Sequence, residues 1–216
     1  MKKFMMETVI TDKIKTQYYS IVDPMIDFFI RQNAHPNVFT LIGLVLSIIS
    51  SIFSGMGIFR MAGLFLLISG MCDSIDGTIA RRSGQASKFG ALFDSTLDRY
   101  SDMFVFFGLA FFFIKEHATL TSIVLAMGLV GTMMVSYIRA RAEGLGFQCS
   151  TGLMQRPERI ILLAFGAITT KSILIMSIWI VAVLSNVTAI QRLFYIRNKD
   201  RTKIRKAVNE QGHISC

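Results

Sequence analysis

Long stretches without charge most constrain the fold of this chain. Six of them are separated by short polar segments: Val38–Ile58, Met61–Cys72, Met103–Ile114, Thr119–Ile138, Ile160–Thr170 and Ser172–Ile190. The first, fourth and last are long enough to cross a bilayer as helices, which takes about 20 apolar residues. The other three reach that length only if flanking charged residues also lie at membrane depth or near the interface, where charge is costly. The pattern predicts an all-α integral membrane protein with six transmembrane helices.

Length and composition favour one membrane-embedded domain. With 216 residues, of which 52% are hydrophobic, the chain is too short for several soluble domains and too apolar for an ordinary soluble one. We expect a single domain over residues 1–216, with a six-span core over 36–197 and a basic cytoplasmic tail over 198–216. In the N-terminal part, residues 1–35, apolar and charged side chains mix over Ile10–Arg31. This mixture predicts an amphipathic helix lying in the membrane interface.

The net charge of +9 follows the expected topology. Lysines and arginines occur before the first span, in two longer connections and in the tail, whereas the alternate connections carry only Arg60, Lys115 and Lys171. Because cytoplasmic loops are enriched in these residues, we expect a multi-pass protein of the cytoplasmic membrane with both termini in the cytoplasm and no nucleic-acid partner. The tail could also hold anionic headgroups, although a solvated charge run is the more common explanation.

Four aspartates form the most informative pattern. Asp73 and Asp76 are three residues apart and Asp94 and Asp98 are four apart, so on helices each pair projects from one face. The polar segment between the pairs contains Gly84 and predicts a short turn between antiparallel helices. Folding this hairpin brings all four carboxylates to a similar depth, facing one another.

Such a cluster requires compensation, because burial and like-charge repulsion both oppose ionisation of the carboxylates. Two divalent cations would supply it. Hard oxygen ligands suit Mg²⁺ or Mn²⁺, and two ions could also bridge a diphosphate. Structural ion pairs with Arg81, Arg82 and Arg99 are the alternative, but ionisable residues at membrane depth point first to function.

The spacing of the fixed residues resembles the signature of the CDP-alcohol phosphotransferases, or phosphatidyltransferases. The pattern Asp-x2-Asp-Gly-x2-Ala-Arg-x8-Gly-x3-Asp-x3-Asp runs from Asp73 to Asp98 and matches at every fixed position. The resemblance implies a six-helix membrane fold, usually homodimeric, with a polar cavity open to the cytoplasm. It further implies that Asp73, Asp76, Asp94 and Asp98 bind the metal ions, and that Asp98 is also the general base.

The same resemblance implies which residues contact the CDP-linked lipid. A Pro-Asn-x-x-Thr sequence precedes the first span and looks like the family's entrance to that span. Together with small, basic and hydroxyl residues of the hairpin, it gives seven expected contacts: Pro36, Asn37, Thr40, Gly77, Arg81, Ser87 and Gly90.

Two later basic clusters bear on the acceptor alcohol. One ends the fourth predicted span with Arg139 and Arg141, and the other opens the fifth with Arg156 and Arg159. Guanidinium groups suit a phosphate dianion, which indicates a phosphorylated acceptor, although positive-inside anchors without a ligand are the alternative. The clusters resemble the phosphatidylinositol-phosphate synthases of bacteria and their archaeal ether-lipid counterparts. That resemblance implies binding of the acceptor phosphate by Arg139, Arg156, Arg192 and Arg197.

The sequence therefore predicts a metal-dependent enzyme. It would transfer a phosphatidyl group from CDP-diacylglycerol, or from a CDP-archaeol type of lipid, to inositol 1-phosphate, giving phosphatidylinositol phosphate and CMP. Synthesis of phosphatidylglycerol phosphate stays open, since glycerol 3-phosphate is also a phosphorylated acceptor. An intramembrane prenyltransferase would normally have more spans and two separate aspartate motifs. A small cation transporter would leave the glycines and arginines of the signature unexplained.

Overall fold

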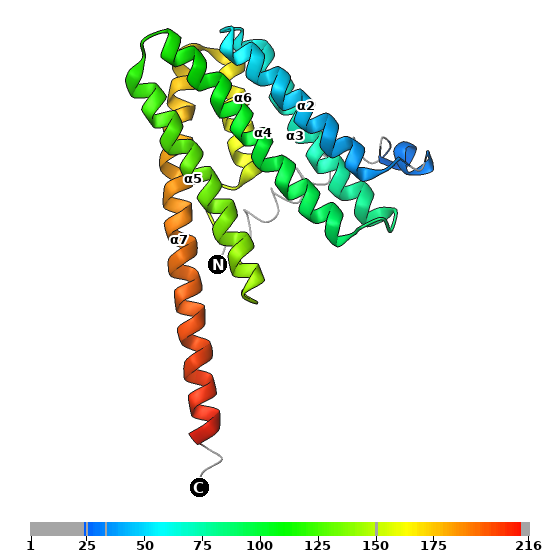
Figure 1. Cartoon of the computed structure of the whole chain (residues 1–216), viewed down its shortest axis with the longest axis vertical. Helices are drawn as coiled ribbons and strands as arrows, with labels where there is room; N and C mark the ends of the chain where they lie inside the picture. The colour runs from blue at the N-terminus through cyan, green and yellow to red at the C-terminus, as the bar shows by residue number, and fades with distance from the viewer. Residues whose placement is uncertain (1–23, 25, 33, 150, 213–216) are drawn as a thin grey trace, which may run out of the picture. The chain divides into compact units, whose positions relative to one another are not determined.

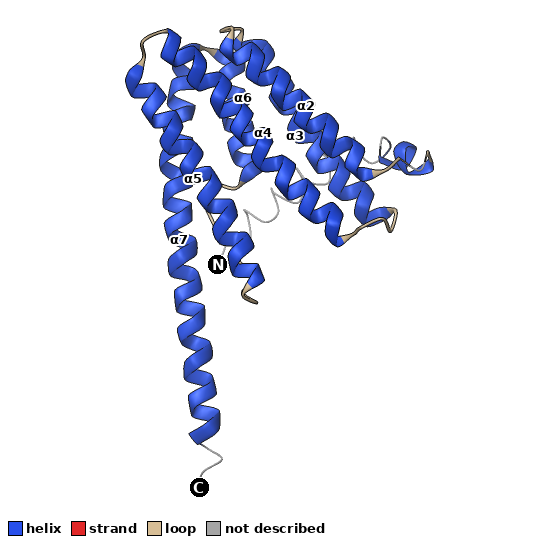
Figure 2. Cartoon of the chain, in the orientation of Figure 1, coloured by secondary structure: helices blue, strands red, loops and turns tan. Residues whose placement is uncertain are grey.

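The computed structural model describes residues 24, 26–32, 34–149 and 151–212, with side chains described as far as residue 202. Six helices follow one another: α2 (Pro36–Gly55), α3 (Phe59–Arg82), α4 (Lys88–Lys115), α5 (Thr119–Gly144), α6 (Arg156–Thr169) and α7 (Lys171–Gly212). Figures 1 and 2 show these helices joined by loops, and no strand occurs in the described ranges. This part of the chain is all-α, as predicted.

Four of these helices are long and apolar enough to cross a membrane: α2, α3, α5 and residues Lys171–Thr202 of α7. The other two fall short for different reasons. Helix α4 has 28 residues, but Asp94, Asp98 and Asp102 lie within its first 15 residues. Helix α6 has 14 residues and is therefore about 21 Å long, against roughly 30 Å of hydrocarbon. The fold is that of an all-α membrane protein, and the count of six spans stays a prediction.

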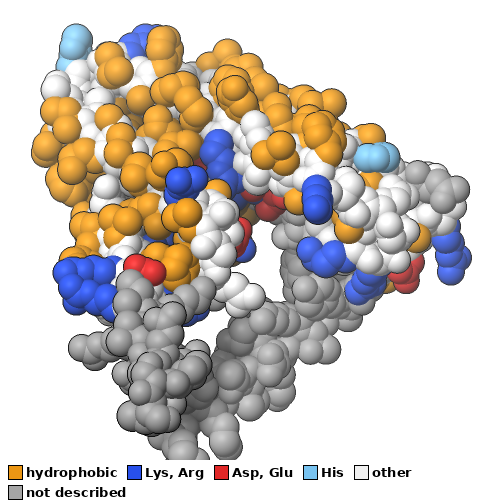
Figure 3. Space-filling model, turned by 60° about the horizontal axis from the view of Figure 1, so that its bottom comes forward, with side chains coloured by type: hydrophobic (Ala, Val, Ile, Leu, Met, Phe, Trp, Pro, Cys, Tyr) orange, Lys and Arg blue, Asp and Glu red, His pale blue; other side chains and the backbone are white. Residues whose placement is uncertain are grey.

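Large apolar side chains are exposed on each of these six helices. Figure 3 shows hydrophobic side chains over much of the visible face. Water-soluble monomers rarely expose so much contiguous apolar surface, whereas contact with lipid requires it. Exposed examples, one from each helix, are Leu41, Leu64, Phe111, Ile123, Phe165 and Val183.

The chain divides into two compact units. The first, here called the aspartate unit, comprises the chain up to Val45 together with Ile68–Asp98. The second, here called the bundle unit, comprises Leu46–Leu67 and the chain from Arg99 onward. Each of helices α2, α3 and α4 contributes one part to each unit.

In the aspartate unit, the start of α2 packs on the end of α3. Phe39, Ile75 and Ile79 form a buried cluster with Ile26, which belongs to a helical segment at residues 26–31. The Ser69 hydroxyl donates a hydrogen bond of 2.9 Å to the Gly43 carbonyl oxygen. Most of the predicted interfacial helix, residues 10–23, lies outside the described residues.

In the bundle unit, α7 packs against both α5 and α6. The buried core draws on five helices, α3 to α7, with one member from each being Leu66, Phe113, Leu125, Leu163 and Ile178. Close approach of backbones adds to this packing, because a Cβ atom at Gly108 of α4 would collide with the Ser51 carbonyl oxygen of α2. Helix α7 continues to Gly212, so the predicted boundary between core and tail, after residue 197, falls inside a helix.

Candidate functional site

Three of the four predicted metal ligands come together in the aspartate unit. Asp73 and Asp76 of α3 and Asp94 of α4 each offer a carboxylate oxygen, and these atoms lie within 4.8 Å of one another. The chain reverses between the two helices at Gly84, whose φ of 70° is a left-handed conformation that favours glycine. Carboxylate oxygens are the ligands that Mg²⁺ and Mn²⁺ prefer, so this group of residues fits a divalent cation.

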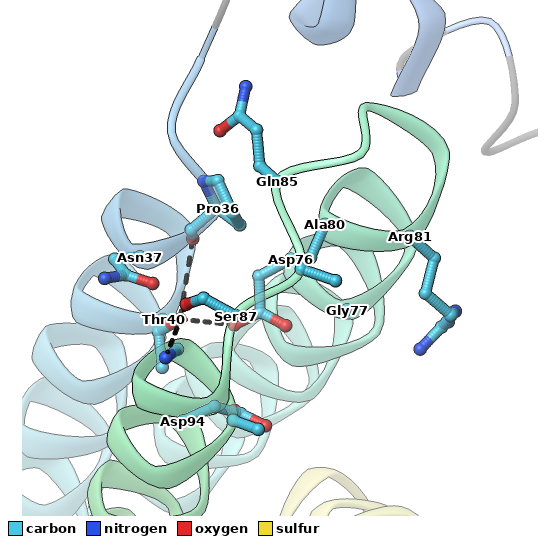
Figure 4. A pocket seen from close by; sticks show the side chains of 13 residues that line it. Pro36, Asn37, Thr40, Asp76, Gly77, Ala80, Arg81, Gln85, Ser87 and Asp94 are labelled. Carbon is cyan, nitrogen blue, oxygen red and sulfur yellow. Dashed lines mark hydrogen bonds between the residues drawn. The ribbon is translucent and has the colours of Figure 1, made fainter.

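Thr40 of α2 orients one of these carboxylates. Its hydroxyl lies 2.6 Å from Asp76 Oδ2 and donates a hydrogen bond to it, and both side chains are buried. In Figure 4, Thr40, Asp76 and Asp94 point toward the same space from three different helices. The resemblance implied a contact of Thr40 with the CDP-linked lipid but not this bond, which joins residues 36 positions apart.

A pocket of about 220 Å³ adjoins the carboxylates. Its lining contains all seven residues expected to contact the CDP-linked lipid, and Asp76 and Asp94 as well. Figure 4 shows how these side chains surround it. The structure thus brings the seven residues into one place, while their contacts with a ligand stay predictions. The pocket also contains residues that we did not predict as contacts: Ala80, Gln85, Ala86 and Ala91.

Arg81 lies beside this pocket because Gly77 leaves room for it. A Cβ atom at Gly77 would be 3.3 Å from Nη1 of Arg81, so the guanidinium folds back over the glycine. Its Nη2 donates a hydrogen bond of 3.3 Å to the Thr78 hydroxyl. The arrangement puts a positive charge next to the pocket, where it could pair with a phosphate.

Asp98, the fourth aspartate of the signature, stands apart from this group. It lies on α4 one helical turn after Asp94 and is partly buried. It is not among the carboxylates that come within 4.8 Å of one another. Its assignments as a metal ligand and as the general base therefore stay predictions.

The four arginines expected to bind the acceptor phosphate all belong to the bundle unit, but their surroundings differ. Arg139 is exposed, and its Nε donates a hydrogen bond of 2.9 Å to Glu143. Arg156, in the first turn of α6, is partly buried, with Nε 3.8 Å from Asp102 Oδ1. Arg197 is exposed on α7.

Arg192 is instead buried, and it holds the loop between α5 and α6. Its Nε donates to the Thr151 carbonyl oxygen at 2.8 Å and its Nη1 to the Val135 carbonyl oxygen at 2.6 Å. One turn earlier on α7, the Thr188 hydroxyl accepts a hydrogen bond from the Met154 amide at 3.1 Å. These contacts assign Arg192 a structural task that its sequence position did not reveal.

Sequence reasoning missed Asp102 and the role of Arg159. Arg159 Nη2 donates a hydrogen bond of 2.8 Å to Asp102 Oδ2, and both side chains are largely buried. One signal was available, because Asp102 follows Asp98 by one further helical turn and directly precedes an uncharged stretch. Its partner, 57 residues away, was not predictable from that spacing.

Comparison with known proteins identifies relatives. Residues 33–196 match the model of the protein family described as CDP-alcohol phosphatidyltransferase. A phosphatidylinositol phosphate synthase of Mycobacteroides abscessus is 31% identical, over 83% of this chain and 85% of the relative. An archaetidylinositol phosphate synthase of Pyrococcus horikoshii is 33% identical, over 76% of this chain and 84% of the relative.

Solved structures of Mycobacterium tuberculosis phosphatidylinositol phosphate synthase are also similar. The structure with CDP-DAG bound is 32% identical and superposes with a TM-score of 0.74, covering 82% of this chain and 94% of that one. The structure in complex with manganese and citrate has the same identity and a TM-score of 0.72, with coverages of 80% and 87%.

We predict that Thr40→Val weakens Mn²⁺ binding about tenfold, because groups that orient a metal ligand typically contribute 10- to 100-fold in affinity. Asp76→Asn should weaken it further, and Thr40→Ser, which keeps the hydroxyl, should bind like the parent. Titration of the purified protein with Mn²⁺, followed by electron paramagnetic resonance, measures each affinity. The control is Glu116→Gln, which removes an exposed carboxylate paired with Lys171. Equal affinities of Thr40→Val and the parent would contradict the role of the hydrogen bond.

We predict that Arg192→Met lowers the free energy of unfolding by about 2–4 kcal/mol, because it removes two charge-assisted hydrogen bonds to backbone carbonyl groups. The measurement is the thermal unfolding midpoint in detergent. Arg197→Met removes an exposed guanidinium of the same helix and should leave the midpoint unchanged. A similar midpoint for both variants would argue against the structural task of Arg192.

Proposed function

The chain belongs to the CDP-alcohol phosphatidyltransferase family, and we propose that it transfers a phosphatidyl group from CDP-diacylglycerol, or from an ether analogue, to inositol 1-phosphate. The products are phosphatidylinositol phosphate and CMP. Membership makes the chain an enzyme of phospholipid biosynthesis. The observation that carries the proposal is the group of three carboxylates next to the pocket in the aspartate unit.

The donor end of the reaction is supported by that pocket. Its volume of about 220 Å³ is below the range of roughly 300–1,000 Å³ typical of whole ligand sites. We infer that it holds the nucleotide part of the CDP-linked lipid and that the acyl or ether chains extend into the bilayer. Pro36, Asn37, Ser87 and Gly90 would contact this part, and Arg81 would pair with a phosphate.

The chemistry needs few protein groups. Two Mg²⁺ ions, or Mn²⁺ ions, held by Asp73, Asp76, Asp94 and Asp98 would neutralise the diphosphate and the departing CMP. Asp98 takes the proton from the acceptor hydroxyl as its oxygen attacks the lipid-linked phosphorus. The bond from that phosphorus to the oxygen of CMP breaks, so CMP leaves with the electron pair. Thr40 keeps Asp76 in place throughout.

The acceptor is assigned from the relatives and from the charge of the bundle unit. The similar proteins named above are synthases of phosphatidylinositol phosphate or archaetidylinositol phosphate. Arg139 and Arg156 lie at the end of α5 and the start of α6, where two guanidinium groups could bind the phosphate of the acceptor. Arg197 is an exposed further candidate, whereas Arg192 is buried and already donates to two backbone carbonyl oxygens.

The membrane arrangement is part of the proposal. Exposed apolar residues on α4 and α6 support six spans within residues 36–197, followed by a basic tail over 198–216. The distribution of lysine and arginine supports cytoplasmic termini and a cytoplasmic active site in the cytoplasmic membrane. Homodimerisation is proposed from the family resemblance.

We predict that purified protein with CDP-diacylglycerol and Mg²⁺ releases CMP and forms a lipid product with inositol 1-phosphate, but not with free inositol or serine. CMP release and lipid product are measured together for each acceptor. If a lipid product formed only with glycerol 3-phosphate, the proposed reaction class would stand and the acceptor would be glycerol 3-phosphate. If no acceptor gave CMP or a lipid product, and the protein carried cations across vesicle membranes, a transporter would be favoured instead.

We predict that Asp98→Asn lowers turnover by about 100-fold or more, the usual contribution of a general base, and changes CDP-lipid binding by less than about threefold. Turnover is followed by CMP release, and binding by titration with CDP-diacylglycerol in detergent. Asp27→Asn removes an exposed carboxylate of the same unit and serves as the control. An equal fall in turnover and binding would contradict the assignment.

A further inference from the structure

Two arginines in the first turn of α6 share one carboxylate, that of Asp102. We propose that Asp102 is a positioning residue for recognition of the acceptor's phosphate, and that Arg159 is the anchor that makes this possible. The inference rests on the proposed function, since it assumes that Arg156 binds a phosphorylated acceptor. It adds Asp102, which belongs neither to the signature nor to the basic clusters, and it gives Arg159 of the second basic cluster a role distinct from that of Arg156.

The geometry of the two pairs is unequal. Arg159 Nη2 is 2.8 Å from Asp102 Oδ2, a full charge-assisted hydrogen bond, whereas Arg156 Nε is 3.8 Å from Asp102 Oδ1. The side chains of Arg159, Asp102 and Arg156 are 3%, 12% and 16% exposed. The tight bond therefore belongs to the more deeply buried side chain, and the looser contact belongs to Arg156, whose Nε and Nη1 are also buried.

Because the two distances differ, Asp102 interacts more strongly with Arg159 than with Arg156. A buried ion pair is stable only if the partners compensate each other closely, and Arg159 does so. Asp102 is then largely neutralised by Arg159, yet its second oxygen still faces Arg156. That oxygen, 3.8 Å from Arg156 Nε, helps to orient the Arg156 side chain. The three side chains together carry a net charge of +1, which suits a phosphate.

Local structure holds both arginines in register. Residues 156 and 159 are three apart, so they share one face of α6. The helix begins at a capping box, in which the Glu158 carboxylate accepts a hydrogen bond of 3.1 Å from the Gln155 amide. The preceding loop is in turn held by Arg192. Asp102 thus contacts two arginines in a helix start that the capping box and Arg192 already order.

A buried donor points to a ligand nearby. Nη1 of Arg159 is buried and has no hydrogen-bond partner among the described residues. Such a donor is costly unless something else accepts from it, and the cost is about 1–3 kcal/mol. The phosphate of an acceptor bound at Arg156, or a water between them, would satisfy it. Arg139 is less suited to this task, because it is paired with Glu143 in solvent.

The test is Asp102→Asn in the full-length enzyme. If Asp102 only contributed a negative charge, it would repel the acceptor's phosphate, and removing that charge would lower the KM for inositol 1-phosphate. As a positioning residue, its loss should raise that KM about tenfold and leave the KM for CDP-diacylglycerol within about twofold of the parent. A lower KM for the acceptor, or an equal rise of both KM values, would overturn the inference. Glu116→Gln is the control and should change neither value.

A second variant covers the case in which Asp102→Asn does not fold, since a lone buried charge is destabilising. Asp102→Leu combined with Arg159→Met removes both buried charges and should restore folding. The KM for the acceptor should stay raised about tenfold in this protein. Recovery of the parent's value would overturn the positioning role.

Assays of the parent enzyme with different acceptors show whether the role of Asp102 or the proposed function itself is wrong. If it uses glycerol 3-phosphate in place of inositol 1-phosphate, the same comparison is made with that phosphorylated acceptor. If it uses only unphosphorylated alcohols, both the acceptor assignment and the role of Asp102 are wrong.

Discussion

The packing of the aspartate unit requires that the negative charges of its clustered carboxylates be compensated. Carboxylate oxygens of Asp73, Asp76 and Asp94 lie within 4.8 Å of one another. At an effective dielectric constant of 20, two unit charges at that distance repel by about 3 kcal/mol. Three such pairs would cost about as much as the whole net stability of a typical domain. The hydrogen bond from Thr40 stabilises one of these carboxylates, and divalent cations would offset the repulsion among all three. In the proposed function, divalent ions bound by these carboxylates would offset this repulsion and also assist catalysis.

Features that depend on short distances along the chain could be predicted from the sequence. The turn at Gly84 and the three-residue spacing of Asp73 and Asp76 fit the observed group with Asp94, because helix geometry determines which side chains share a face. The four-residue spacing did not bring Asp98 into that group. The contents of the pocket were predictable only through the resemblance to a family. The helical class followed from apolar segments, but α4 and α6 show the limit of that argument. Charges at one end of α4 and the shortness of α6 make hydropathy alone indecisive.

Contacts between distant segments could not be predicted. The bond between Thr40 and Asp76 spans 36 positions, and the pair of Asp102 and Arg159 spans 57. Neither spacing follows from a helical period. Arg192 is a further example. A basic residue at the end of a span suggests a membrane anchor or a residue that binds a ligand. In the structure it is buried and donates to two backbone carbonyl groups. Composition does not distinguish these roles, since each needs the same guanidinium.

In the proposed function, donor chemistry and acceptor recognition draw on different parts of the chain. The carboxylates and the pocket belong entirely to the aspartate unit, whereas Asp102 and the arginines belong to the bundle unit. Transfer from a CDP-linked lipid requires the same diphosphate to be neutralised whichever alcohol attacks, which constrains the first set of residues closely. An acceptor differs in shape and charge, and the start of α6 could change to suit it without disturbing the carboxylates. In the proposed scheme, helix α4 carries Asp94 and Asp98 for donor chemistry and, one turn later, Asp102 for acceptor recognition. Under this proposal, substitutions that change the acceptor should be sought from Asp102 onward, because those at the signature aspartates would alter the transfer chemistry itself.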